Sequence, residues 1–262
     1  MGEKFSKYEK QGAYHWSALY GEGWMRSSPR LHARYDIPTW ILSQRINLSK
    51  SRGVDVGCGD GVLLYKVRRE GGYIYGLDHS DEGLALAREQ LDRRNVFSGN
   101  LIKGSCYQIP LDSESVDYVT AIELIEHLDD VDAFLNETER ILRPGGWFVC
   151  TTPNREKGQA PDEVRDSFHV HEYIPRELQS ALNKQFSEVA ILGAYPEYLD
   201  RLYVRNRESG ILDKAARAFF RAVAFGIANP YVLTLSEDPT HKSRLLIGVG
   251  QKNHESRCNV CR

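Results

Sequence analysis

The chain has 262 residues, a formal net charge of -2 from 34 Lys and Arg against 36 Asp and Glu, and 41% hydrophobic residues. A globular protein of this length can bury a full core. The near-neutral charge gives no general basic surface, so nucleic acid is not the expected partner. Five scattered cysteines do not form the disulfide framework of a small secreted domain. Without a long apolar segment, we expect no stable membrane insertion and a cytoplasmic location.

Alternating strand and helix patterns begin near residue 52. Apolar runs predict strands over 53–57, 73–78, 101–105, 115–122, 146–153, 187–194 and 243–252. Helical spacing predicts helices over 63–70, 80–94, 131–142 and 175–184, with Ser80 as the N-cap of the second. This alternation predicts an α/β fold with a doubly wound, mostly parallel sheet.

A glycine-rich turn, VDVGCGDG at 54–61, joins the first predicted strand to the first predicted helix. Glycines at 57, 59 and 61 permit positive φ and a close approach of the backbone to a ligand. Asp78 ends the next strand, where a carboxylate can accept both ribose hydroxyls of an adenosine. The pattern indicates a nucleotide site, although a structural turn and a helix-capping Asp78 are the alternatives.

These residues resemble class I S-adenosylmethionine-dependent methyltransferases, in particular the ubiquinone-biosynthesis O-methyltransferases. The matching segments are VDVGCGDG, YGLDHS, IPLDSESVDYVTAIELIEHL, LRPGGWF and TTPN, which occur in the expected order. The resemblance implies a seven-stranded sheet with an antiparallel last strand. It also implies that the Gly57 loop holds the methionine part of S-adenosylmethionine and that Asp78 holds the ribose.

The N-terminal segment is rich in aromatic residues, and we expect Tyr14, His15 or Trp16 near the cofactor. Many relatives have Asp where Ser105 stands, so a hydroxyl or the Cys106 backbone would replace that contact to adenine. The expected cofactor-binding residues are Tyr14, Trp16, Asp55, Gly57, Cys58, Gly59, Gly61, Asp78, His79, Ser105, Cys106, Ile122 and Glu123.

The sequence ELIEH follows the fourth predicted strand. If a helix begins here, Glu123, Glu126 and His127 share one face. They can form a general base with an orienting carboxylate, a site for Mg²⁺ or Mn²⁺, or only a structural pair. The small-RNA 2′-O-methyltransferases of the resembling family use this pattern with a further histidine, which His169 or His171 could supply. We expect Glu126, His127 and His171 as catalytic residues, and the same three with Glu123 as the ligands of any metal.

The sequence divides into an N-terminal helical cap at 1–50, a methyltransferase domain at 51–252 and a tail at 253–262. A segment at 195–242, too long for a plain connection, is expected to be a lid with an amphipathic helix. A homodimer contact, a membrane-surface segment or part of the core are the alternatives for that helix. The tail offers His254, Cys258 and Cys261, half of a zinc site, although we expect a disordered tail.

The expected function is transfer of a methyl group from S-adenosylmethionine to a small-molecule acceptor, at a hydroxyl oxygen, in a biosynthetic pathway. One alternative is a metal-dependent RNA 2′-O-methyltransferase. Its local support is a set of arginines and tyrosines at Arg201, Arg205, Arg207, Tyr198 and Tyr203. A non-catalytic cofactor-binding scaffold is the other alternative.

Overall fold

The computed structural model describes residues 7–20, 29–155, 160, 164, 166–196, 235–236 and 243–254. The strands are β1 (Arg52–Val56), β2 (Tyr73–Asp78), β3 (Leu101–Lys103), β4 (Val116–Ile122), β5 (Leu142–Pro153), β6 (Ser187–Pro196), β7 (Leu235–Ser236) and β8 (Ser243–Gln251). The α-helices are α1 (Lys7–Gln11), α2 (Tyr14–Tyr20), α3 (Pro29–Ser43), α4 (Val62–Arg69), α5 (Asp81–Asp92), α6 (Val131–Ile141) and α7 (Pro175–Leu182). Two 3₁₀ turns, η1 (Leu48–Lys50) and η2 (Ile125–His127), complete the list.

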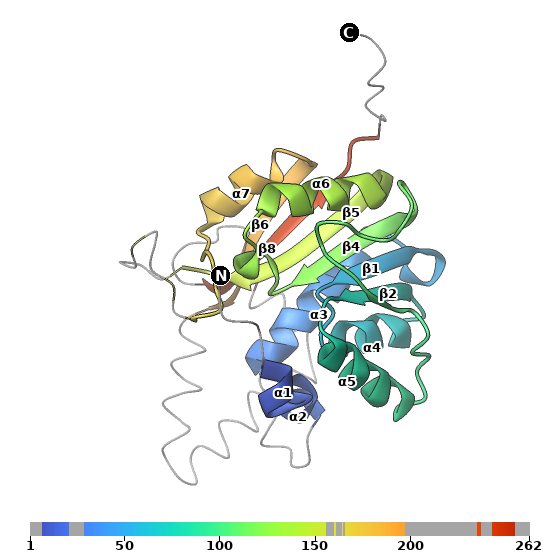
Figure 1. The fold of residues 1–262 in the computed structure, drawn as a ribbon. Helices are drawn as coiled ribbons and strands as arrows, with labels where there is room; N and C mark the ends of the chain where they lie inside the picture. Colours follow the sequence, from blue (N-terminus) through green and yellow to red (C-terminus); the bar gives the residue numbers. More distant parts are fainter. Residues whose placement is uncertain are drawn as a thin grey trace.

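The strands form one sheet in the order β3-β2-β1-β4-β5-β8-β6-β7 (Figure 1). Strands β1 to β5 pair in parallel, whereas β8 runs antiparallel to both β5 and β6. The predicted seven-stranded sheet with an antiparallel last strand is therefore confirmed. The two-residue β7, which no sequence pattern predicted, pairs with the edge of β6.

Several predicted features lie outside the described residues. They are the 195–242 segment apart from its first two residues and β7, its amphipathic helix, the arginine and tyrosine set, and Cys258 with Cys261. His254 is described, and its ring lies beside the backbone of Gly145. Among the described residues, Cys58, Cys106 and Cys150 are free thiols.

Helices cover both faces of the sheet (Figure 1). Helices α3, α4 and α5 lie on one face and α6 and α7 on the other, and each face has its own cluster of buried apolar side chains. The predicted N-cap of α5 is confirmed, because Ser80 Oγ accepts the N–H of Gly83 at 3.0 Å. Parallel pairing brings the carboxyl ends of β1, β2 and β4 to one edge, where an α/β sheet binds ligands.

Gly53 in β1 leaves room for the ring of Tyr118 in β4. A Cβ at this position would lie 2.1 Å from Tyr118 Cε2. Gly53→Ala is therefore expected to lower the free energy of unfolding by about 3 kcal/mol, because the fully buried ring has no space to move. Urea unfolding measures this loss.

Gly71→Ala is the matched control. Gly71 has a φ of +79°, but its Cβ would meet only Ser49 Cβ at 3.5 Å. The free energy of unfolding of Gly71→Ala should fall by only about 1 to 2 kcal/mol, the cost of placing an alanine at positive φ. Equal losses in Gly53→Ala and Gly71→Ala would contradict the packing argument.

Candidate functional site

The loop between β1 and α4 is shaped by its three glycines. Gly57, Gly59 and Gly61 have φ values of +76°, +51° and +82°. All three lie in the left-handed region, which favours glycine and explains the GxGxG pattern. The N–H groups of Gly57 and Cys58 donate to Leu77 O at 2.7 and 3.0 Å. The loop is thus fixed to the end of β2, with its backbone facing the ligand edge of the sheet.

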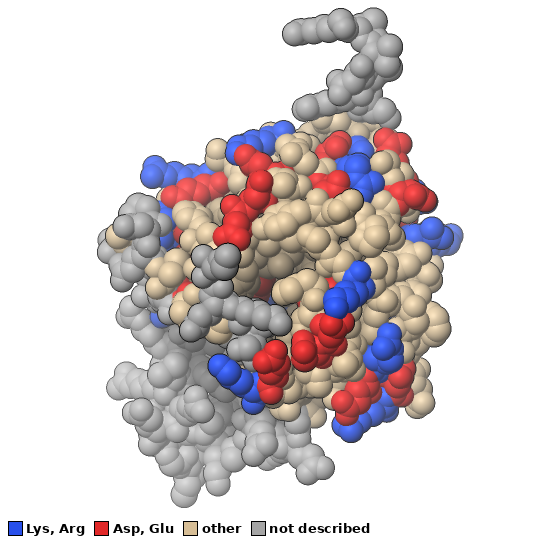
Figure 2. All heavy atoms as spheres, viewed as in Figure 1, with Lys and Arg blue, Asp and Glu red and all other residues tan. Residues whose placement is uncertain are grey.

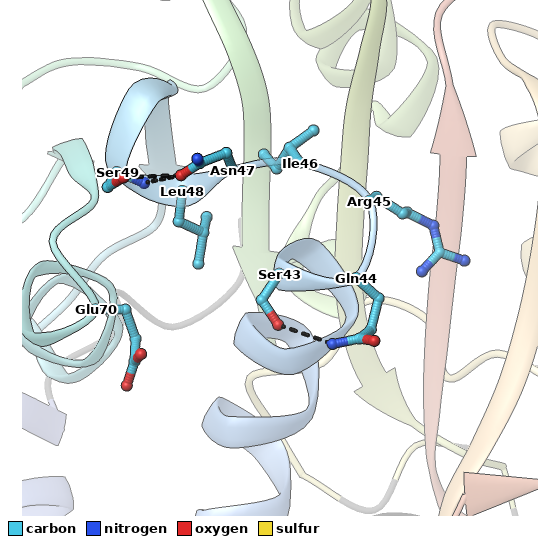
Figure 3. A pocket seen from close by; sticks show the side chains of 8 residues that line it. All are labelled: Ser43, Gln44, Arg45, Ile46, Asn47, Leu48, Ser49 and Glu70. Atoms are coloured by element: carbon cyan, nitrogen blue, oxygen red, sulfur yellow. Dashed lines mark hydrogen bonds between the residues drawn. The ribbon is translucent and has the colours of Figure 1, made fainter.

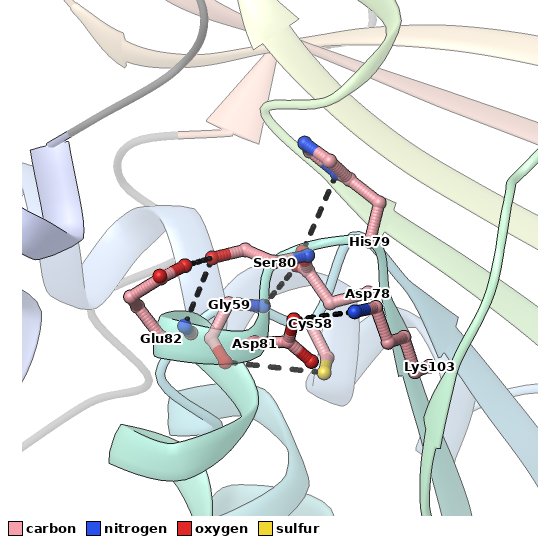
Figure 4. Close-up of polar contacts among 9 residues, drawn as sticks. Cys58, Gly59, Asp78, His79, Ser80, Asp81, Glu82 and Lys103 are labelled. Carbon is pink, nitrogen blue, oxygen red and sulfur yellow. Dashed lines mark hydrogen bonds and ion pairs between the residues drawn. The ribbon is translucent and has the colours of Figure 1, made fainter.

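Asp78 ends β2 and is buried beside this loop (Figure 4). Its Oδ2 accepts the N–H of Gly59 and its Oδ1 accepts the N–H of Ser80, both at 2.8 Å. His79 is 70% exposed, and its Nδ1 lies 3.5 Å from Asp78 Oδ1. A carboxylate oxygen has two lone pairs, so each oxygen retains one for a ligand hydroxyl. This arrangement fits the diol of a ribose.

The segment after β3 lies next to Asp78. The N–H of Gly104 donates to Asp78 O at 3.0 Å. Ser105 is exposed, and its Oγ accepts the N–H of Tyr107 at 3.1 Å. Burial raises the pKa of the half-buried Cys106 to about 11, so this residue is a neutral thiol at pH 7. Both residues expected near adenine therefore belong to the segment that lies next to Asp78.

The expected α-helical face at ELIEH is wrong. Glu123 leaves β4 with a φ of +51°, and the residues after it form the 3₁₀ turn η2. The carboxylate of Glu123 forms an ion pair with Arg34 of α3 at 2.7 Å. Thr151 Oγ1 also donates to Glu123 Oε1 at 3.2 Å. Arg34 and Thr151 therefore hold the Glu123 carboxylate, whose charge still acts on the nearby Glu126.

Glu126, His127 and His169 form the one group of potential metal ligands among the described residues, with one donor atom of each within 4.8 Å of the others. His127 Nδ1 donates to Phe168 O, and His169 Nδ1 donates to Glu172 Oε1, each at 2.8 Å. These bonds place the lone pair of each imidazole on Nε2. Ligating histidines in metal sites are held in this way.

Glu126 is 1% exposed, and neither of its carboxylate oxygens makes a hydrogen bond of normal geometry with a described residue, although the nearby Thr152 hydroxyl acts to lower its pKa. Burial, and after it the charge of Glu123, raises the pKa of Glu126 well above its usual value. A buried carboxylate without donors is costly unless it takes up a proton or a cation. The cluster is therefore suited to either.

His171 does not join this cluster, contrary to the sequence expectation. Its Nε2 lies 3.3 Å from Glu177 Oε2 in α7, while its main-chain N–H donates to Glu126 O at 3.2 Å. The turn before it wraps around η2, bringing His169 to His127 and carrying His171 on toward α7. The second imidazole of the group is His169.

The N-terminal helices reach the glycine loop. A Cβ on Gly59 would lie 1.8 Å from Tyr8 Oη, so the α1 tyrosine lies directly against the loop. Burial, and then the charge of Asp60, raises the pKa of Tyr14 to about 12. Trp16 Nε1 donates to Asp60 O at 2.6 Å. The aromatic residues at 14–16 thus lie beside the loop, and Tyr8 is a neighbour that the sequence reasoning missed.

Comparison with known proteins places this geometry in a family. The family model "Methyltransferase domain" matches residues 54–150. A "probable S-adenosylmethionine-dependent methyltransferase" of Mycolicibacterium smegmatis is 35% identical over 140 residues, covering 52% of this chain and 51% of the relative. A ubiquinone biosynthesis O-methyltransferase of Bradyrhizobium sp. is 33% identical over 168 residues, covering 63% of each. The chain thus spans about half to two thirds of these two curated relatives.

A solved SAM-dependent methyltransferase from Thermotoga maritima has the same fold, with a TM-score of 0.61 and 18% identity over 95% of this chain and 98% of that one. Residues 54–150 form a class I S-adenosylmethionine-dependent methyltransferase domain. The loop at 57–61 and Asp78 are the parts of this methyltransferase domain whose geometry fits the cofactor.

None of the helices in the described part of the chain has the length and apolar composition needed to span a membrane.

A hollow of about 540 Å³ lies beside η1, near the amino end of β1 (Figure 3). Its lining comes from the end of α3, from η1 and from Glu70 after α4. Asn47 there accepts from Ser49 at the start of η1. Because η1 leads into the amino end of β1, this hollow is separate from the cofactor edge.

Asp55 in β1 is a buried acid of the methyltransferase domain. Thr120 Oγ1 donates to its Oδ1 at 2.8 Å, but burial dominates and raises its pKa from 3.8 to about 7. Between these two pKa values the folded protein holds a proton that the unfolded chain has released. The free energy of unfolding should therefore fall as pH rises from about 4 to 7, by up to about 4 kcal/mol, and then level off.

The variant Asp55→Asn should lose this pH dependence, because the amide keeps the Thr120 bond and does not ionise. Urea unfolding of both proteins between pH 5 and pH 8 measures the difference in slope. An identical slope in the two proteins would contradict the assignment to Asp55.

Proposed function

We propose that this protein transfers the methyl group of S-adenosylmethionine to a hydroxyl oxygen of a small-molecule acceptor in a biosynthetic pathway. The observation that carries the proposal is the group formed by Glu126, His127 and His169. The turn η2, which carries Glu126 and His127, begins next to the cofactor loop, because a Cβ on Gly57 would meet Leu124, the residue before η2, at 3.0 Å. The Bradyrhizobium relative, an O-methyltransferase by name, supports the same acceptor atom.

The cofactor supplies a methyl group already activated by its bond to a sulfonium. The residues of this chain then have two tasks, which are to orient the acceptor and to take its proton. Asp78 and the glycine loop would hold the cofactor at the edge of the sheet. His127, whose Nδ1–H is fixed on Phe168 O, would accept the hydroxyl proton at Nε2.

The two unpartnered oxygens of Glu126 favour a second way to activate the hydroxyl, which is a bound divalent cation. Glu126, His127 and His169 would be its ligands. Two imidazoles and one carboxylate suit Mn²⁺, Fe²⁺ or Zn²⁺ better than Mg²⁺, which prefers an all-oxygen shell. A cation would also offset the buried negative charge.

The described part of the face in Figure 2 favours a small acceptor over RNA. On the described part of the face in Figure 2, Lys and Arg side chains lie among Asp and Glu side chains and form no continuous basic area. RNA binding depends on such an area, because the phosphates dominate affinity.

A methyl-transfer assay with a panel of phenols, catechols and sugars, and with short RNA 3′ ends, tests the proposal. We expect O-methylation of a small molecule and none of RNA. Loss of activity in EDTA with recovery in Mn²⁺ would identify the cation mechanism, and insensitivity would identify the base. Transfer only to RNA or to nitrogen, or cofactor binding without turnover on any acceptor, would contradict the proposal.

A further inference from the structure

Asp60, in the middle of the cofactor loop, holds helix α2. The residue is 1% exposed. Its main-chain oxygen accepts the indole N–H of Trp16 at 2.6 Å, and its Oδ1 lies 3.1 Å from His15 Nδ1. Both partners belong to α2, so a single loop residue connects the N-terminal helices to the backbone that faces the cofactor.

The other carboxylate oxygen of Asp60 is unsatisfied. Its Oδ2 is buried and has no hydrogen-bond partner in the described part of the chain. Three phenols lie near Asp60, those of Tyr8, Tyr14 and Tyr35. Burial raises the pKa of each, and among the neighbouring charges Asp60 raises it most. A desolvated anionic oxygen of this kind requires a donor, preferably a cationic one.

A positive charge, that of Arg34, also lies near Tyr14. Arg34 acts to lower the pKa of Tyr14, whereas Asp60 raises it. The Nε of Arg34 is also buried without a partner among the described residues. Near the phenol of Tyr14 the site therefore has an unpartnered carboxylate oxygen of Asp60 and an unpartnered Nε–H of Arg34, whose guanidinium is otherwise paired with Glu123. The methionine part of S-adenosylmethionine carries the complementary pair, an α-ammonium and an α-carboxylate.

We propose that Asp60 is a cofactor-positioning residue whose Oδ2 accepts the α-ammonium of the methionine part while its other two oxygens hold α2. Docking of the N-terminal helices and binding of the cofactor then support each other, and this coupling is reciprocal. The inference rests on the cofactor binding of the proposed function. It extends that function by giving α2 a role in cofactor binding.

The test compares two ligands in the wild type and in Asp60→Asn by titration calorimetry. S-adenosylhomocysteine has the amino-acid end, and 5′-methylthioadenosine has the same nucleoside without it. In the variant, the side-chain amide oxygen would still accept from His15, and the main-chain oxygen still accepts from Trp16, so α2 stays docked. We expect S-adenosylhomocysteine to bind about 10- to 100-fold more weakly and 5′-methylthioadenosine to bind within about twofold of the wild type.

Asp112→Asn is the control, because Asp112 is an exposed aspartate, and neither ligand should change. Limited proteolysis gives a second measurement, with cleavage after the exposed Lys10 of α1 as its readout. S-adenosylhomocysteine should slow cleavage of the wild type more than 5′-methylthioadenosine does. In Asp60→Asn this difference should disappear.

Equal weakening of both ligands in Asp60→Asn, or no change in either, would overturn the role of Asp60. If the variant does not fold, the test uses the wild type alone. Its affinity for S-adenosylhomocysteine is compared with its affinity for an analogue that lacks the α-amino group. Equal affinity for the two compounds would remove the ammonium contact and leave the proposed function intact. Failure of the wild type to bind S-adenosylhomocysteine at all would contradict both proposals.

Discussion

His127→Asn is expected to lower kcat about 10²- to 10⁴-fold while the affinity for S-adenosylhomocysteine stays within about twofold. The amide that replaces the imidazole can still donate to Phe168 O in place of Nδ1, so the turn η2 keeps its geometry. What the variant loses is Nε2, the atom that takes the hydroxyl proton or a cation. Steady-state kinetics and calorimetry together separate this chemical loss from a loss of cofactor binding.

His171→Asn is the matched control, since His171 lies in the same turn but its imidazole is paired with Glu177. Its kcat should stay within about threefold of the wild type. Glu126→Gln, which removes the buried charge without changing its shape, should resemble His127→Asn if a cation binds, because a neutral amide is a poor ligand. An active His127→Asn protein would refute the role of the cluster, and an inactive His171→Asn protein would return His171 to the site.

The parts of the site that the sequence predicts are those set by short-range rules. Three glycines at GxGxG spacing fix a left-handed loop whatever surrounds it, and β2 places Asp78 beside that loop because parallel strands end at one edge. The same holds for the strands, whose apolar runs define the sheet, and for Ser80 as the cap of α5.

The parts that the sequence did not predict depend on contacts between distant segments. Arg34 meets Glu123 only because α3 packs against the sheet near the end of β4, and no local motif marks it. The choice between His169 and His171 depends on how a turn some forty residues after His127 wraps around η2. In each case the sequence indicates what chemistry the residue can perform, but it does not predict which residue it contacts.

The kink at Glu123 shows the same limit at a single residue. A positive φ is unusual for glutamate, and a helical motif gave no reason to expect it. It is held by tertiary bonds, since the N–H of Glu123 donates to Thr151 O at 3.0 Å and its carboxylate is paired with Arg34. Backbone strain of about 1 to 3 kcal/mol persists only where surrounding contacts compensate, as they do here.

Asp78→Asn is expected to weaken both S-adenosylhomocysteine and 5′-methylthioadenosine about 100-fold. The carboxylate now accepts one backbone N–H on each oxygen, from Gly59 and from Ser80. An amide must turn its NH₂ toward one of these donors, which both displaces the glycine loop and removes an acceptor for the ribose. Loss of two charge-assisted hydrogen bonds, at about 1.5 kcal/mol or more each, gives this magnitude.

Asp81→Asn provides the control, because Asp81 is an exposed neighbour that pairs with Lys103 and should affect neither ligand (Figure 4). The decisive comparison is between ligands. The ribose is common to both compounds, so Asp78→Asn must weaken both, whereas Asp60→Asn should weaken only the one with an amino-acid end. If Asp78→Asn weakened S-adenosylhomocysteine alone, Asp78 would belong with the methionine part, and the cofactor would have to lie in the opposite direction along the edge of the sheet.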